Sequence, residues 1–120
     1  MDKFESILNC DHKNKKILLF PDFSSAGMWC ECGCGFGNPS EEFSHIPDGL
    51  IELIQLWNNY WDSSCFLDTY WDESPTLEEI EIRQTRINKM GRELSKIVSR
   101  YHPCVFMEDR SKIIFPKGIE

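Results

Sequence analysis

The stretch DGLIELIQLWNNYW, residues 48–61, decides the fold because it predicts a long and largely buried helix. Polar side chains recur in and just after it at spacings of three or four residues and nearly all the others are apolar; the polar positions are Glu52, Gln55, Asn59 and Asp62. Pro47 and Asp48 suit a first helical turn, through the fixed φ of proline and through a negative charge at the positive end of the helix dipole. Other elements must therefore cover most of this helix.

A second helix is expected downstream, with Ser74 as its N-cap and Pro75 at its first position. Its apolar positions have helical spacing and are Leu77, Ile80, Ile87, Met90, Leu94, Ile97, Val98 and Tyr101. Pro103 ends the helix. Gly91 lies at the edge of the apolar face, where the missing side chain allows another element to approach closely.

Short apolar runs predict strands at residues 16–20 and 27–32, and residues 104–107 and 112–115 predict a hairpin. The order is strand, strand, helix, helix, hairpin. It predicts an α+β fold in which a small, mainly antiparallel β-sheet packs against two α-helices, with a C-terminal β-hairpin. A chain of 120 residues is expected to form a single domain over residues 1–120.

The location expected from composition is the cytoplasm. No signal-peptide pattern and no apolar run of about 20 residues is found, so no membrane partner is expected. The six cysteines are expected to remain mainly thiols in a reducing compartment.

Charge is segregated along the chain. Between Lys16 and Arg83 there is no Lys or Arg, and that interval holds thirteen carboxylates, whereas all thirteen bases lie outside it. Because phosphate binding depends on Lys and Arg, the central region is not expected to bind nucleic acid, and a basic partner fits it better.

Two parts of the acidic region have different explanations. Glu78, Glu79 and Glu81 fall in the first turns of the second helix, where the helix dipole alone favours them. The connection between the helices is longer than packing requires, and it sets acids beside Tyr70 and Trp71. Rings that bury contact area and charges that steer encounter suit a protein interface, although these rings could equally close the core under the loop.

Other chemistry is weakly indicated. Cys30, Cys32 and Cys34 could bind zinc or an iron–sulfur cluster, but C-x-C-x-C is not the usual ligand spacing, and the fourth ligand stays open among His45, Cys65, His102 and Cys104. Gly33, Gly35 and Gly37 lead into acids instead of an anion-binding helix, so no nucleotide is expected. Thiol catalysis would need a Cys and a His to meet in space, for example Cys65 with His45, and no such pair is signalled. No enzyme activity and no cofactor are predicted.

A small acidic chain without a catalytic motif, with the segment GMWCECGCGFGN and an acidic, aromatic inter-helix loop, resembles the immunity proteins of bacterial toxin systems, in particular those of contact-dependent growth inhibition. The resemblance covers the type of chain and has no diagnostic motif.

The resemblance implies that the chain binds and neutralises a cognate protein toxin, which is basic and could be a nuclease domain. The candidate contact residues are Asp62, Asp68, Tyr70, Trp71, Asp72, Glu73, Glu78 and Glu79. Three alternatives stay open: a small metal-binding regulatory module built on the cysteine cluster, a DNA-mimicking inhibitor, and a thiol enzyme. The basic residues of the second helix count against the DNA mimic.

Overall fold

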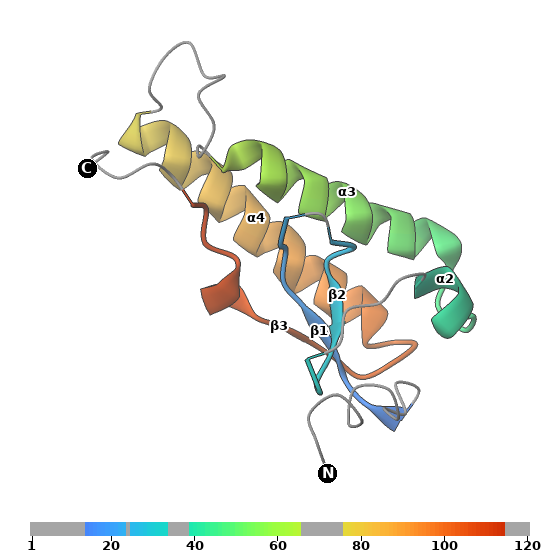
Figure 1. Ribbon diagram of the computed structural model, residues 1–120. Helices are drawn as coiled ribbons and strands as arrows, with labels where there is room; N and C mark the ends of the chain where they lie inside the picture. Colours follow the sequence, from blue (N-terminus) through green and yellow to red (C-terminus); the bar gives the residue numbers. More distant parts are fainter. Residues whose placement is uncertain (1–13, 24, 34–38, 66–75, 115–120) are drawn as a thin grey trace.

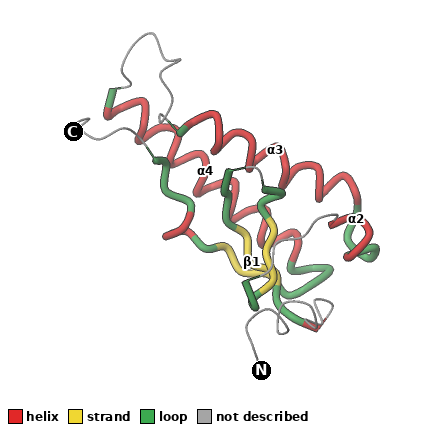
Figure 2. Tube along the Cα trace, viewed as in Figure 1, coloured by secondary structure: helices red, strands yellow, loops and turns green. Residues whose placement is uncertain are grey.

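The computed structural model describes residues 14–23, 25–33, 39–65 and 76–114 (Figure 1). The elements in chain order are β1 (Ile17–Leu19), β2 (Met28–Cys30), α2 (Pro39–Glu42), α3 (Asp48–Ser64), α4 (Leu77–Val98), β3 (Cys104–Phe106) and the 3-10 helix η2 (Glu108–Arg110). The fold class is α+β, as expected, with two long helices packed together on one side of a small sheet (Figure 2). No helix in the described ranges combines the length and the apolarity needed to cross a bilayer.

The sheet has three strands in the order β2-β1-β3. β1 pairs with β2 in an antiparallel register that sets Leu18 opposite Trp29, and with β3 in a parallel register that sets Leu18 opposite Val105. The sheet is therefore mixed, where a mainly antiparallel sheet was expected. Side chains alternate between the faces of a strand, so Ile17 and Leu19 are fully buried under the helices while Leu18 is only partly buried.

α3 supplies much of the core, and its side chains Ile51, Ile54, Trp57 and Trp61 are almost completely buried. The helix is more exposed than its sequence suggests, because Leu53 and Leu56 are 52% and 62% accessible. The expectation that only the polar stripe faces solvent was wrong. The reason is that sheet and partner helix together cover only part of the circumference of α3.

α4 begins at Leu77 and is capped by Thr76, so the cap expected at Ser74 is displaced. Thr76 and Glu79 form a capping box, in which the Thr76 hydroxyl accepts from the Glu79 amide at 3.1 Å and the Glu79 carboxylate accepts from the Thr76 amide at 3.4 Å. The expectation for Gly91 is confirmed: it is buried against the ring of Phe106 in β3. The helix face buried in the core is Ile80, Ile87, Gly91, Leu94 and Val98.

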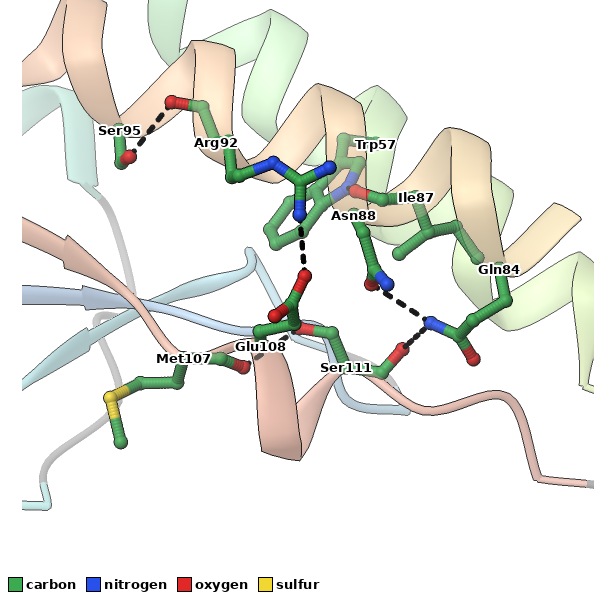
Figure 3. Close-up of polar contacts among 9 residues, drawn as sticks. All are labelled: Trp57, Gln84, Ile87, Asn88, Arg92, Ser95, Met107, Glu108 and Ser111. Carbon is green, nitrogen blue, oxygen red and sulfur yellow. Dashed lines mark hydrogen bonds and ion pairs between the residues drawn. The ribbon is translucent and has the colours of Figure 1, made fainter.

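The chain after β3 is held by side chains of the helices (Figure 3). Gln84 donates to the carbonyl of Ser111 at 2.9 Å and accepts from the amide of Ile113 at 2.7 Å, and Arg92 contacts Glu108 at 2.5 Å. Trp61 donates to the carbonyl of Lys112 at 3.1 Å. Residues 111–114 thus bond to helix side chains and contain no strand, so the expected hairpin is not formed among the described residues. β3 pairs with β1 instead.

Candidate partner-binding surface

α3 carries three acidic residues, Asp48, Glu52 and Asp62, and no basic one. All three are exposed. Their spacing, together with that of Gln55 and Asn59, places them on the side of the helix away from the core. The exposed polar stripe of α3 is therefore acidic and amide in character and contains no base.

The first turns of α4 add Glu78, Glu79 and Glu81, all exposed. The Glu79 carboxylate accepts from the Thr76 amide in the capping box, so its negative charge offsets the partial positive charge of the helix N-terminus. Glu78 and Glu81 line a shallow surface depression together with Ile82, Thr85 and Arg86. These two carboxylates are the α4 acids with the greatest freedom to meet a partner.

The end of α3 lies beside the second turn of α4, because the Arg83 guanidinium donates to the Ser64 hydroxyl at 3.1 Å. Asp62 and Glu81 each lie two residues before one of these contacting residues. Since a residue step on a helix rotates by about 100°, both carboxylates point away from the contact between the helices. Asp62 and Glu81 thus lie at the same end of the helix pair but on its two different sides.

Of the eight candidate contact residues, the structure places Asp62, Glu78 and Glu79 at this end of the molecule. The other five lie outside the described residues; they are Asp68, Tyr70, Trp71, Asp72 and Glu73. The sequence-based set omitted Glu52 and Glu81, although Glu52 had been assigned to the exposed stripe of α3 and Glu81 to the first turns of α4.

The exposed acids of this surface take part in no ion pair among the described residues. The ion pairs found in the described part of the chain are Arg92 with Glu108 and Lys96 with Glu93, and both lie toward the other end of α4. None of the acids Asp48, Glu52, Asp62, Glu78 and Glu81 takes part in them. Five bases and a single acid follow in α4 after Ile82, so the helix pair is acidic along α3 and at the start of α4, and basic beyond.

Two of the described thiols, Cys65 and Cys104, are poorly suited to catalysis. Burial raises the pKa of the Cys65 thiol to about 11, against a smaller lowering by the Ile114 amide, with the charge of Asp62 also raising it. Burial raises the pKa of Cys104 to about 12. Both are protonated at neutral pH, whereas the nucleophile is the thiolate. Cys65 and His45 do not meet, because the two residues flank opposite ends of α3, about 25 Å apart.

The cysteine cluster begins at the end of β2. Cys30 is buried, and a turn closed by the Gly33 amide and the Cys30 carbonyl at 2.8 Å leaves Cys32 exposed. Within the described ranges no group of three His, Cys, Asp or Glu side chains could hold a metal ion. Cys34 lies outside those ranges, as do Gly35 and Gly37, so the three-cysteine metal site stays a prediction that elemental analysis of the purified protein can test.

No sequence pattern indicated a contact between His45 and His102, which are far apart in the chain. His45 Nε2 lies 3.1 Å from His102 Nδ1, and His102 Nε2 lies 2.6 Å from the Lys15 carbonyl oxygen. Because a carbonyl only accepts, His102 Nε2 carries hydrogen, and its Nδ1 accepts from His45 when His102 is neutral. With the ring of Phe43 against both imidazoles, the pair ties the start of β1 to the loops before α3 and β3.

Aromatic side chains form a second feature that sequence reasoning missed. The Phe20 ring stacks on Trp29 with centroids 4.9 Å apart, and the Arg110 guanidinium lies 5.0 Å from the centre of the Phe20 ring. Depressions on either side share Phe20, Asp22 and Arg110 in their walls. These walls hold both signs of charge, so they do not form a dedicated anion or cation site.

Comparison with known proteins found no significant match to a family model, to a curated protein or to a solved structure. The function is therefore inferred from the chemistry of the surface.

Proposed function

We propose that this protein is an immunity protein, which binds a basic protein toxin and neutralises it by covering its substrate-binding surface. The contact would be made by the end of the helix pair where α3 ends and α4 begins. The described residues there are Asp62, Glu78 and Glu79, with Glu81 added from the structure. The candidate residues of the connection between the helices complete the proposed surface.

The segregation of charge carries the proposal. α3 contains acids and no base, the first turns of α4 contain three acids, and the acids that face solvent at this end have no basic partner in the described part of the chain. Like charges repel one another in the free protein, and a cationic partner reduces that repulsion. Complementary potentials also raise the rate of encounter and select against acidic competitors.

A nuclease domain is the partner class that this surface fits best. Nucleases need a basic surface to hold a polyanionic substrate, so an acidic inhibitor can occupy the same field as the substrate. The resemblance to contact-dependent growth inhibition immunity proteins supports the same partner class. The bases of α4 beyond Ile82 interrupt the acidic surface on that helix, which is not expected for a mimic of extended DNA.

The test is capture followed by inhibition. Tagged protein is used to capture stoichiometric partners from its native cell extract, and the basic partner recovered is purified and assayed with the immunity protein at increasing molar ratio. We expect loss of toxic enzyme activity at a 1:1 ratio. A tightly bound partner that is acidic, or that keeps its activity when saturated, would contradict the proposal.

A further inference from the structure

Large apolar side chains gather on the outer side of the helix pair, away from the sheet. Leu53 and Leu56 in α3 are 52% and 62% accessible, and Ile82, Met90 and Ile97 in α4 are 45%, 39% and 36% accessible. Single exposed apolar side chains are ordinary, but a gathered patch on one face is typical of an interaction surface. We refer to these five residues as the outer helical face.

Hydrogen bonds fix the direction in which the outer helical face points. Asn58 bonds to Asp22 at 2.9 Å and so marks the sheet side of α3; Leu56, two residues earlier, points to the opposite side. Gln84 bonds to Ser111 at 2.9 Å and marks the β3 side of α4; Ile82, two residues earlier, again points away. The apolar side chains of both helices therefore face the same way.

The two helices contribute to this face at matching levels. Trp57 Nε1 donates to the Ile87 carbonyl at 3.0 Å, which aligns these two positions in the antiparallel pair. Leu53, four residues before Trp57, is then level with Met90 and Gly91 on α4, about one turn beyond Ile87. Leu53 and Met90 thus border the same part of the groove between the helices.

The charges beside the apolar residues are complementary across a twofold axis. Glu52 lies four residues before Leu56 on the same side of α3, and α3 has no base. This side of α4 carries Arg86, Lys89 and Glu93, and Glu93 forms an ion pair with Lys96 at 3.6 Å, so the side is net basic. Lys89 lies seven residues after Ile82 and within about one turn of the level of Glu52. A twofold axis along the groove would set α3 of each copy on α4 of the other, with Glu52 facing Lys89.

We propose that the outer helical face binds a second copy of this chain, forming a symmetric dimer with four antiparallel helices at its centre. A twofold axis across the groove would instead set acidic α3 against acidic α3, which like-charge repulsion disfavours. The self-complementary arrangement is the usual one for dimers. The dimer is a property separate from toxin neutralisation, and the two surfaces border one another at Ile82, which also lines the depression beside Glu78 and Glu81.

The dimensions of the face fit a weak dimer. A pair of helices about 25 Å long and roughly 20 Å wide covers on the order of 500 Å² per partner. The total of roughly 1,000 Å² is near the lower bound for a specific interface. We therefore expect a dimer that dissociates at micromolar concentrations.

Sedimentation equilibrium over a wide range of protein concentration tests the proposal. Leu56→Glu should weaken dimerisation by about tenfold or more, because it places a charge in the apolar centre. The matched control is Leu77→Glu, which changes an equally exposed leucine (51%) outside this face and should leave the dimer unchanged.

Charge exchange identifies the pairing. Glu52→Lys and Lys89→Glu should each weaken the dimer several-fold, because each places like charges opposite one another. The double variant should restore the dimer, because Lys at position 52 of one copy then faces Glu at position 89 of the other. A chain that is monomeric throughout, or a dimer insensitive to all of these variants, would overturn the proposal. A monomer whose Leu56→Glu variant loses toxin binding would also overturn it, by assigning the face to the toxin.

Discussion

At the scale of single residues, the tightest steric constraint among the described glycines is at Gly91, which has no room for a side chain. A Cβ at Gly91 would lie 2.7 Å from Cδ1 and Cζ of Phe106, and nearer still to Cε1. The ring of Phe106 also packs edge-on against Trp57, with centroids 5.9 Å apart, so it has little freedom to retreat. β3 can therefore approach α4 only because this residue is glycine.

We expect Gly91→Ala to lower the free energy of unfolding by about 1–3 kcal/mol, because overpacking exceeds the roughly 1 kcal/mol that alanine adds to helix propensity. Gly49→Ala is the control, since a Cβ there meets no atom within 4 Å. It should leave stability unchanged or slightly raised. Urea denaturation measures both. Equal midpoints for the two variants would show that Phe106 moves freely.

The buried thiols predict a dependence of stability on high pH. Folding raises the pKa of Cys65 from 9.0 to about 11 and that of Cys104 from 9.0 to about 12. The folded state therefore holds these protons more tightly than the unfolded state, and the stabilisation is complete below pH 9 and is lost as pH rises through the folded-state pKa values.

Urea midpoints should therefore fall between about pH 9 and pH 11, and less so in a Cys65→Ser, Cys104→Ser double variant. Peptide mapping after iodoacetamide at pH 8 should show slow modification of both thiols in the folded protein and rapid modification in urea. Rapid modification of either thiol in the folded state would contradict the burial argument.

At the scale of elements, the sequence predicted α4 but not the residue that caps its N-terminus. Ser74-Pro75 is an acceptable cap pair, but Thr76 is followed at three residues by Glu79, which completes a reciprocal capping box. Two backbone amides gain partners through Thr76, which explains why the helix begins after it. The acids of the first turn thus have a structural role as well as the proposed binding role.

Thr76→Ala should destabilise the fold by about 1 kcal/mol through loss of the cap. Thr85→Ala is a matched control on the same helix. The Thr85 hydroxyl donates to the Glu81 carbonyl at 2.8 Å and caps no helix end. It should be neutral or slightly stabilising, because alanine has the higher helix propensity. Thermal unfolding followed by circular dichroism would contradict the account if both changes had the same effect.

Periodicity predicted both long helices and all three strands, because each depends on a local apolar pattern. It failed where pairing is long-range. Trp61 and Gln84 bind the backbone of residues 111–113, where the return strand of the expected hairpin would lie, and no local signal encodes those contacts. The role of Asn58 was likewise not predicted, because its position in the helix indicates only an apolar environment. The side chain is buried and bonds to Asp22 and Ser25 in the β1–β2 turn.

At the scale of the whole molecule, the sequence predicted the segregation of charge but not its distribution over the surface. Asp62 and Glu81 are both acidic and both near the end of the helix pair, yet contacts at Ser64 and Arg83 direct them to different sides. The connection that carries Asp68, Tyr70, Trp71, Asp72 and Glu73 lies outside the described residues, so those candidates stay predictions. A partner that touches both sides must reach around this end.

The most direct test of the central claim is the rate of association with the purified basic partner, measured by stopped flow at low and high salt. Asp62→Lys with Glu78→Lys should slow association by tenfold or more at about 0.02 M salt and much less at about 0.5 M, because salt screens exposed charges. Glu93→Lys with Asp109→Lys, a double reversal of exposed acids away from this end, changes the net charge by the same amount and should have a small effect. An association rate that is equal for all variants, or independent of salt, would contradict the proposal that the acidic end is the docking surface.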